Sequence, residues 1–361
     1  MAQDQLRDEI VHLQEQVQAA KLPLDLREKL SLMIKRLGRM LKFGRYTSEY
    51  EQTATYIQWL TSLPWQTRSE DLLELKQAKI ILDQNHYGLN QIKERILEYL
   101  AVLILRKKQT DQSQLVLEDK NVLSLTSAPI LCFVGLVGTG KTTLASAIAQ
   151  AMHRKFIRIP FGGMGSALDL RGQSRVHPDA EAGLVLKAIK RCGTKNPVIL
   201  LDEIDRVSPS ARSEIMGVLV ELLDPEQNMA FRDHFVDYPF DLSEVLFITT
   251  CNNTTNISVA VLDRLEPMQM PSYNDNEKIV IAKDYVLPKR IKQAGLTASN
   301  LQIDDDVWPL LVRPLGYDAG IRTLGRMINS LCRKVAKMIV EGKGTSFRVT
   351  KENLREYVSA W

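Results

Sequence analysis

The sequence has few cysteines, and their spacing matches neither a disulfide framework nor a metal site. Among 361 residues there are only four: Cys132, Cys192, Cys251 and Cys332. They lie far apart, with no CxxC or cysteine–histidine spacing, so a stabilising disulfide network and a structural zinc site are excluded. Each is flanked by apolar or helix-like sequence, which predicts four buried free thiols.

Long hydrophobic runs and an excess of charge of one sign are also missing. No segment approaches the roughly 20 apolar residues that span a bilayer. Lys plus Arg number 47 against 43 Asp plus Glu, and this near balance argues against a dedicated nucleic-acid binder or a polybasic membrane protein. The first residues are polar and unlike a signal or transit peptide. We therefore expect a soluble, intracellular protein without membrane contact.

The composition, with 45% hydrophobic and 25% charged residues, is that of a globular protein of two or three domains. Apolar residues at helical spacing predict helices within residues 1–62. The clearest such stripe consists of Leu26, Leu30, Met33, Leu37 and Leu41. Further helical patterns cover residues 72–82 and 89–107, and the polar stretch 108–120 predicts a loop.

Three short apolar runs, at residues 130–134, 198–201 and 245–248, predict strands covered on both faces. Helical segments separate them, which indicates an α/β fold with a parallel sheet. Helical patterns at residues 277–294, 307–313 and 321–341 then predict a small helical lid. The predicted domains are a helical N-terminal segment (1–62), an α/β nucleotide-binding domain (63–273) and the lid (274–361).

The strongest motif is the run Gly135-Leu-Val-Gly-Thr-Gly-Lys141-Thr142, which follows the first predicted strand directly. This is the Walker A pattern, in which glycines let backbone N–H groups surround a phosphate and a helix N-terminus adds its dipole. Lys141 would neutralise the β- and γ-phosphates, and the hydroxyl of Thr142 would bind Mg²⁺. The spacing, the strand and the Lys-Thr pair all favour a nucleotide site over a chance glycine-rich turn.

Some 60 residues further on, the apolar run from Val198 ends in two carboxylates, Asp202 and Glu203. Alone, such a pair is often a surface turn. After a Walker A motif it predicts a Mg²⁺-binding Asp202 and a Glu203 that orients and activates the attacking water. Together the motifs predict hydrolysis of a nucleoside triphosphate beyond the carboxyl ends of the strands.

Three more polar positions are candidates for the same site. Either Asn252 or Asn253, just past a predicted strand, would position the water, unless both serve an Asx turn. Arg264 follows a short helical pattern, and Arg322 begins a helix of the predicted lid. Taken singly each arginine is more often ion-paired, but beside phosphate motifs they suggest charge stabilisers, one of them reaching a neighbouring subunit's nucleotide.

This order of motifs resembles the AAA+ ATPases and, more narrowly, the ATPase module of Lon proteases over about residues 22–358. The supporting runs are Leu63-Pro-Trp65, Asp83-Gln-Asn-His-Tyr-Gly-Leu89, Lys93-Glu-Arg-Ile-Leu-Glu-Tyr99, Gly193-Thr-Lys-Asn-Pro197, Leu222-Leu-Asp-Pro-Glu-Gln-Asn228 and Asp241-Leu-Ser-Glu-Val-Leu-Phe247. The resemblance implies that Asn252 is sensor 1, Arg264 the arginine finger and Arg322 sensor 2. The nucleotide site, for ATP or ADP with Mg²⁺, would comprise His86, Tyr87, Gly88, Gly135, Gly138, Thr139, Gly140, Lys141, Thr142, Thr143 and Asp202, the first three closing over adenine.

The resemblance further implies a hexameric ring in the full-length context that threads unfolded or damaged protein through its pore into a protease chamber. No segment resembles the serine-containing protease motif, so we expect no peptidase activity in this chain. The alternatives are a protease-less ATP-dependent chaperone, a nucleotide-ordered scaffold, or a nucleic-acid motor supported only by short basic clusters. Glu203 favours the enzyme, since a scaffold needs no such carboxylate. Weak DNA binding fits the family.

The first pore loop departs from the usual pattern of the family. Most Lon proteins carry an aromatic–aliphatic pair where His177 and Pro178 stand here, which leaves the grip on substrate to these residues, to Val176 or to the backbone. The second pore-loop region, 208–212, also departs. The run 170–178 looks closer to fungal peroxisomal forms, which favours the peroxisomal matrix, with the mitochondrial matrix or cytoplasm as alternatives.

Overall fold

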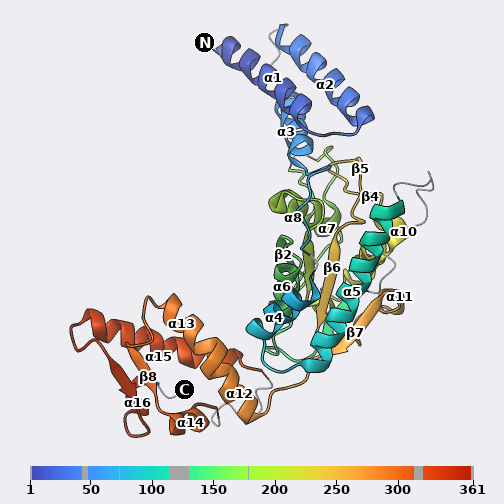
Figure 1. Cartoon of the computed structure of the whole chain (residues 1–361). Coiled ribbons are helices and arrows are strands. Elements are labelled where there is room, and N and C mark those ends of the chain that lie inside the picture. Colours follow the sequence, from blue (N-terminus) through green and yellow to red (C-terminus); the bar gives the residue numbers. More distant parts are fainter. Residues whose placement is uncertain are drawn as a thin grey trace. The chain divides into compact units, whose positions relative to one another are not determined.

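The computed structural model describes residues 2–42, 48–72, 74–113, 130–177, 179–312 and 320–358 (Figure 1). The chain divides into two compact units, between which it passes several times. The first comprises Met1–Leu73, Val102–Cys132 and Met152–Glu266, and the second Glu74–Ala101, Phe133–Ala151 and Pro267–Trp361. The domain boundaries predicted at residues 62 and 273 stay a prediction.

The N-terminal residues form three helices that pack on one another within the first unit: α1 (Ala2–Ala19), α2 (Leu24–Lys42) and α3 (Ser48–Ser62) (Figure 1). Pro23 directly precedes α2, where its fixed φ suits a helix start. The buried stripe of α2 runs through Leu26, Leu30, Ile34 and Leu37. Ile34 therefore takes the place predicted for Met33, which is only half-buried; the side chain of Leu41 lies outside the described residues.

Aromatic contacts fix α3 to a two-stranded hairpin, β4 (Phe231–Arg232) and β5 (Pro239–Phe240), in the same unit. The hydroxyl of Tyr56 donates to the carbonyl oxygen of Val236 at 2.8 Å. The ring of Trp65 lies 5.0 Å from that of Phe240, centroid to centroid. Such aromatic pairs combine area burial with defined geometry, so they set where the N-terminal helices join the α/β fold.

The central sheet has the strand order β2-β3-β6-β1-β7. Its strands are β1 (Ile130–Val134), β2 (Phe156–Pro160), β3 (Val198–Asp202), β6 (Leu246–Cys251) and β7 (Leu265–Gln269). The neighbours β2, β3 and β6 are parallel, with Leu201 opposite Thr249. All residues of β3 and β6 are buried, so the runs predicted to be covered on both faces are so, and the α/β fold class is confirmed.

The helices before and between these strands are α4 (Leu75–Asn85), α5 (Asn90–Ser113), α6 (Lys141–Ala151), α7 (Leu168–Arg171), α8 (Leu184–Cys192), α9 (Arg212–Leu223), α10 (Pro225–Asn228) and α11 (Val259–Leu262). The predicted loop at 108–120 is wrong for its first part, because α5 continues to Ser113 through polar residues free of glycine and proline. Residues 114–120 lie outside the described part of the chain.

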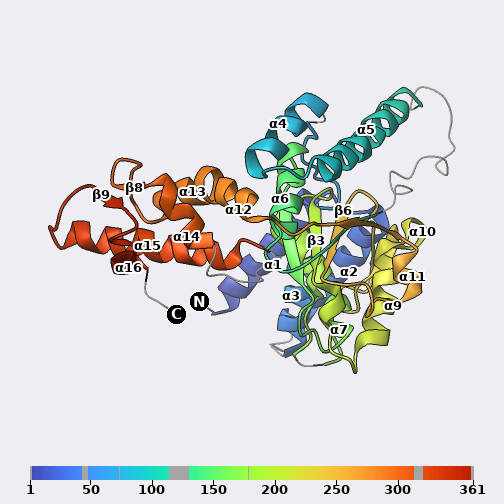
Figure 2. The same cartoon turned by 90° about the horizontal axis from the view of Figure 1, so that it is seen from below.

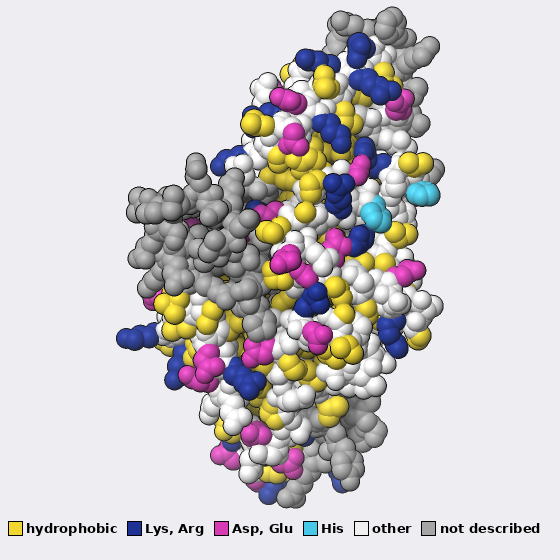
Figure 3. All heavy atoms as spheres, turned by 90° about the vertical axis from the view of Figure 1, so that its right-hand side faces the viewer, with side chains coloured by type: hydrophobic (Ala, Val, Ile, Leu, Met, Phe, Trp, Pro, Cys, Tyr) yellow, Lys and Arg dark blue, Asp and Glu magenta, His cyan; other side chains and the backbone are white. Residues whose placement is uncertain are grey.

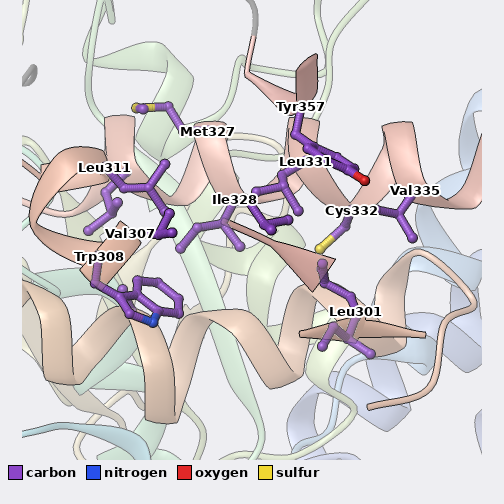
Figure 4. Packing of buried hydrophobic residues seen from close by; sticks show 14 of the residues in the cluster. Leu301, Val307, Trp308, Leu311, Met327, Ile328, Leu331, Cys332, Val335 and Tyr357 are labelled. Carbon is purple, nitrogen blue, oxygen red and sulfur yellow. The ribbon is translucent and has the colours of Figure 1, made fainter. Parts of the chain in front are cut away.

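The C-terminal residues form a helical lid within the second unit (Figure 2). Its elements are α12 (Asp275–Ile281), a π-helical turn (Ala282–Val286), α13 (Leu287–Gln293), β8 (Leu301–Ile303), α14 (Trp308–Val312), α15 (Arg322–Val340), β9 (Phe347–Val349) and α16 (Leu354–Tyr357). Trp308, Ile328 and Leu331 form the centre of its core (Figure 4). The parallel pair β8–β9 adds two short strands to the lid, which the helical patterns alone did not predict.

The cysteine prediction holds for three residues of four. Cys132, Cys251 and Cys332 are buried free thiols, but Cys192, at the end of α8, is half-buried. Among the described residues, no three or more His, Cys, Asp or Glu side chains come together as a group that could hold a metal ion. None of the described helices combines the length and the hydrophobicity needed to span a membrane.

Candidate functional site

The glycine-rich loop after β1 is shaped by two residues with positive φ. Gly138 has φ +86° and Gly140 φ +94°, a backbone region that glycine adopts without strain. The turn brings residue 141 to the start of α6. The Lys141 ammonium lies over its own loop and donates to the carbonyl oxygens of Gly135 at 2.5 Å and Leu136 at 3.0 Å. Lys141 is buried, so the loop holds a positive charge at a helix N-terminus.

The start of the lid helix α15 touches this loop directly. The backbone N–H of Ile321 donates to the carbonyl oxygen of Gly138 at 3.2 Å. A Cβ atom on Gly320 would lie only 2.4 Å from the carbonyl carbon of Gly138, so only glycine fits there. Arg322 begins α15, and its Cβ lies 3.3 Å from the position of a Cβ on Gly138. The second unit thus brings the predicted Arg322 to the predicted phosphate loop.

His86, at the end of α4, lies against the other side of the loop. Its Nε2 is 2.9 Å from Oγ1 of Thr143, and its carbonyl oxygen accepts from Lys93 Nζ at 2.7 Å. Burial, and next the charge of Lys93, lower the pKa of His86 to about 4, so the imidazole is neutral at pH 7. Its buried Nδ1 has no hydrogen-bond partner among the described residues. A neutral ring with one unused polar atom can recognise a ligand.

The next two residues of this predicted segment turn the chain toward α5. Tyr87 and Gly88 are half-buried, and Gly88 has φ +61°.

Tyr273 also contacts the loop, since its hydroxyl donates to the carbonyl oxygen of Thr139 at 3.1 Å. Burial raises the pKa of Tyr273 to about 12, which keeps this donor protonated.

In the first unit, strand β3 ends at Asp202, whose carboxylate is buried and hydrogen-bonded on both oxygens. Arg158 Nε donates to Oδ2 at 2.5 Å, and the Thr250 hydroxyl donates to Oδ1 in a short hydrogen bond. The side chain of Asp202 is 5% exposed and that of Arg158 is 50% exposed. A buried carboxylate with polar partners on both oxygens keeps a fixed orientation.

Glu203 adopts a left-handed backbone conformation, with φ +58° and ψ +48°. Non-glycine residues are rare in this region, and such conformations cost about 1–3 kcal/mol and gather at functional sites. The N–H of Glu203 donates to Oγ1 of Thr250 at 2.9 Å. Its half-buried carboxylate lies 3.6 Å from Arg206 NH1 and packs against Gly162. The strained turn keeps one carboxylate buried and aims the next one outward.

The two asparagines after β6 differ in their surroundings. Asn253 is exposed, and its Oδ1 accepts from the N–H of Thr255 at 3.2 Å, which is a local turn contact. Asn252 is half-buried and adjoins the strand end directly. The geometry therefore favours Asn252 for the sensor position, an assignment that stays a prediction.

Arg264 follows α11 and is bound within its own chain. Its NH2 donates to Oδ2 of Asp224 at 2.6 Å, and its NH1 donates to the carbonyl oxygen of Ala260 at 2.8 Å. The hydrogen bond from Arg264 holds the pKa of Asp224 below its usual range. Asp224 is also the N-cap of α10. Arg264 is thus held at one position by a rigid neighbour.

The predicted first pore loop is a closed loop with a fixed base. Residue 173 donates its N–H to the carbonyl oxygen of Glu181 at 3.0 Å. A Cβ on Gly183 would lie 2.0 Å from the carbonyl oxygen of Leu170, so the two ends of the loop meet where only glycine fits. The tip carries Val176, which is 88% exposed, and the exposed His177. Pro178 lies outside the described residues.

Sequence reasoning missed four residues that shape these sites: Lys93, Arg158, Thr250 and Tyr273. Only Arg158 carried a visible signal, because a charged residue inside the run Phe156-Ile-Arg-Ile-Pro160 is unusual for a strand. The other three act through contacts between segments distant in sequence.

Two families match parts of the chain. Residues 131–272 match the ATPase family associated with various cellular activities (AAA), and residues 292–347 match the Lon protease AAA+ ATPase lid domain. The chain is also similar to bacterial Lon proteases over nearly its whole length. It is 40% identical to the Lon protease of Syntrophomonas wolfei, covering 99% of this chain and 42% of that relative. It is 39% identical to Lon protease 1 of Bacillus subtilis, covering 97% and 43%.

It is likewise 38% identical to Lon protease 2 of Thermus thermophilus, covering 97% of this chain and 42% of that relative. The chain thus spans about two-fifths of the length of these relatives. The match of residues 131–272 of this chain to the AAA family supports the predicted ATPase activity.

Proposed function

We propose that this chain, an AAA+ ATPase module of the Lon type, uses ATP hydrolysis to pull unfolded or damaged protein through the pore of a ring. The observation that carries the proposal is the contact between the loop at Gly138 and the lid residues Gly320–Arg322. A loop that holds phosphate and touches the first turn of a lid helix can pass the loss of a phosphate to that helix.

The phosphate loop supplies the binding part of the cycle. Its N–H groups and the N-terminus of α6 favour an anion, and Lys141 adds a positive charge. Arg322, exposed beside the same loop, adds a second positive charge from the lid. His86, with its unused Nδ1, would meet the base of the nucleotide together with Tyr87 and Gly88.

The two residues predicted to bind magnesium carry donors of the right chemical type. The hydroxyl of Thr142 and the carboxylate of Asp202 are oxygen ligands, the type that Mg²⁺ prefers. When bound, Mg²⁺ would neutralise charge on the phosphate oxygens. Thr250 would keep Asp202 oriented, and the half-buried carboxylate of Glu203 would polarise the attacking water. Asn252 would help to place that water.

The remaining step needs a second copy of the chain. We infer that Arg264 acts as the arginine finger on a neighbour's nucleotide, in a ring that is hexameric in the full-length protein. Asp224 would hold the guanidinium ready, since it already fixes its position. The loop tip at Val176 and His177, exposed on a fixed base, would contact the translocated chain.

Two finer assignments belong to the same proposal. The likeness of residues 170–178 to fungal peroxisomal forms favours a peroxisomal location, which imaging of the tagged full-length protein tests. Weak DNA binding has little support from charge, because basic and acidic side chains are interspersed on the described part of the face in Figure 3. Any affinity for DNA should fall steeply with salt.

The experiment is steady-state ATP turnover with and without an unfolded protein, with oligomer size recorded in the same samples. We expect turnover in the assembled ring that unfolded protein stimulates, and loss of stimulation when Val176 and His177 are both replaced by glycine. An assembled ring that binds ATP without turnover would overturn the proposal and favour a nucleotide-ordered scaffold.

A further inference from the structure

Arg158 pairs with the buried carboxylate of Asp202 from a position that solvent can reach. Its Nε lies 2.5 Å from Oδ2, yet half of its side chain is exposed, whereas Asp202 is almost fully buried. The other carboxylate oxygen is held by Thr250, which is fully buried. Of these two partners, Thr250 is therefore fixed, whereas Arg158 can leave into water.

We propose that Arg158 is a positioning residue that compensates the charge of Asp202 between nucleotides and competes with the magnesium ion for it. The inference rests on the proposed role of Asp202 at that ion. A buried carboxylate without a positive partner is strongly disfavoured, so some cation must face it in every state. Arg158 contributes to this compensation before the nucleotide arrives.

A guanidinium and a divalent cation beside one carboxylate oxygen repel each other. Arg158 must therefore move away, or share Oδ2 at a cost, when the ion is bound. Because half of its side chain already meets solvent, it can swing out without leaving a buried charge behind. Its return would then help to expel the ion with the product. Arg158 thus lowers the apparent affinity for magnesium and speeds release of the ion and the product from the site.

The structure offers a matched control for the loss of an ion pair. Arg68 donates to Glu244 through Nε at 2.6 Å and NH2 at 2.7 Å, and its side chain is 53% exposed, much as that of Arg158 is. It belongs to the segment after α3 and contacts none of the residues proposed to act on the nucleotide. Arg68→Gln therefore controls for general effects of removing such a pair.

The test measures binding of a fluorescent ATP analogue to the full chain across a titration of free Mg²⁺, alongside turnover. Arg158→Gln keeps a hydrogen-bond donor but removes the charge. We expect it to lower the half-saturating Mg²⁺ concentration about two- to fivefold, the effect typical of an ion pair with one exposed partner. Arg158→Lys keeps a positive charge but lacks the planar guanidinium, so it should lower the half-saturating Mg²⁺ concentration by a smaller factor. Arg68→Gln should leave this concentration unchanged.

An unchanged or higher Mg²⁺ requirement in Arg158→Gln would overturn the inference, the higher value meaning that Arg158 helps to hold the ion. If Arg158→Gln does not fold, as judged by circular dichroism, the same criterion applies to Arg158→Lys. Asp202→Asn separates this inference from the proposed function. If Asp202→Asn has the same half-saturating Mg²⁺ concentration as the wild type, the proposed role of Asp202 is refuted. If Asp202→Asn needs more Mg²⁺ but Arg158→Gln has the wild-type requirement, only the competition by Arg158 is refuted.

Discussion

Thr250 joins the two carboxylate residues at the end of β3 through a single hydroxyl. That hydroxyl donates to Oδ1 of Asp202 and accepts from the N–H of Glu203, and the residue is fully buried. Thr250→Val removes the hydroxyl while keeping the shape of the side chain. The Oδ1 atom of Asp202 and the N–H of Glu203 then both lose this hydrogen bond.

Each buried polar group left without a partner costs about 1–3 kcal/mol, so the pair should cost about 3 kcal/mol of unfolding free energy. For a domain of this size that lowers the melting temperature by about 6–12 °C. Looser placement of Asp202 and Glu203 should also slow ATP turnover about 10- to 100-fold, since small misplacements of reacting groups have effects of that order.

The neighbouring Thr249 provides the control. It is equally buried in β6, but its hydroxyl faces the thiol of Cys132, a weak hydrogen-bond partner, and touches neither carboxylate residue. Thr249→Val should therefore change stability by less than about 1 kcal/mol and leave turnover unchanged. Thermal unfolding by circular dichroism and a coupled ATPase assay measure both. Equal melting temperatures and rates for the two variants would refute the linking role of Thr250.

Three further predictions follow from the same structure. The lowered pKa of His86, about 4 against 6.5 when unfolded, means that the unfolded state takes up a proton first as the pH falls. Relative to His86→Gln, the wild type should thus lose about 2 kcal/mol between pH 7 and pH 5 in denaturant titrations. Gly183→Ala places a Cβ 2.0 Å from a backbone oxygen and should cost at least about 3 kcal/mol, while Gly217→Ala, in open space on α9, should be neutral or stabilising. In the ring proposed above, Arg264→Ala should cut turnover about 10³-fold or more while nucleotide binding persists, and Asp224→Asn should cut it less.

Each of these predictions has an outcome that contradicts it. A pH-independent difference between wild type and His86→Gln would mean that folding does not lower the pKa of the imidazole. Equal stabilities of Gly183→Ala and Gly217→Ala would show that the backbone at the base of the predicted first pore loop shifts to accommodate the added Cβ. Turnover of Arg264→Ala within a few-fold of the wild type would remove the finger assignment, and an equal loss in Asp224→Asn would make the ion pair itself the cause.

Local signals in the sequence were enough for much of the fold. Continuous apolar runs predicted β1, β3 and β6 because strands buried on both faces need no polar alternation. The edge strands β2 and β7 were missed, since Arg158 in one and Pro267 in the other break such a run, as edge positions allow. The helix α5 extends beyond the apolar pattern that predicted it, because polar residues such as lysine and glutamine also favour a helix.

The candidate site was predictable only where one segment carries the chemistry. The phosphate loop and the Asp202–Glu203 pair each lie in a single run of sequence, so spacing revealed them. The partners of Asp202 come from β2 and β6, and the contact between Gly138 and Gly320 joins residues far apart along the chain. Such contacts depend on tertiary packing, which periodicity does not report.

The central claim is that this chain hydrolyses ATP with Glu203 as the residue that activates water. The most direct measurement is ATP turnover of the wild type and of Glu203→Gln, with nucleotide binding determined on the same samples. The account predicts that Glu203→Gln binds ATP as well as the wild type does and turns over almost none. Equal turnover by the two proteins would contradict it.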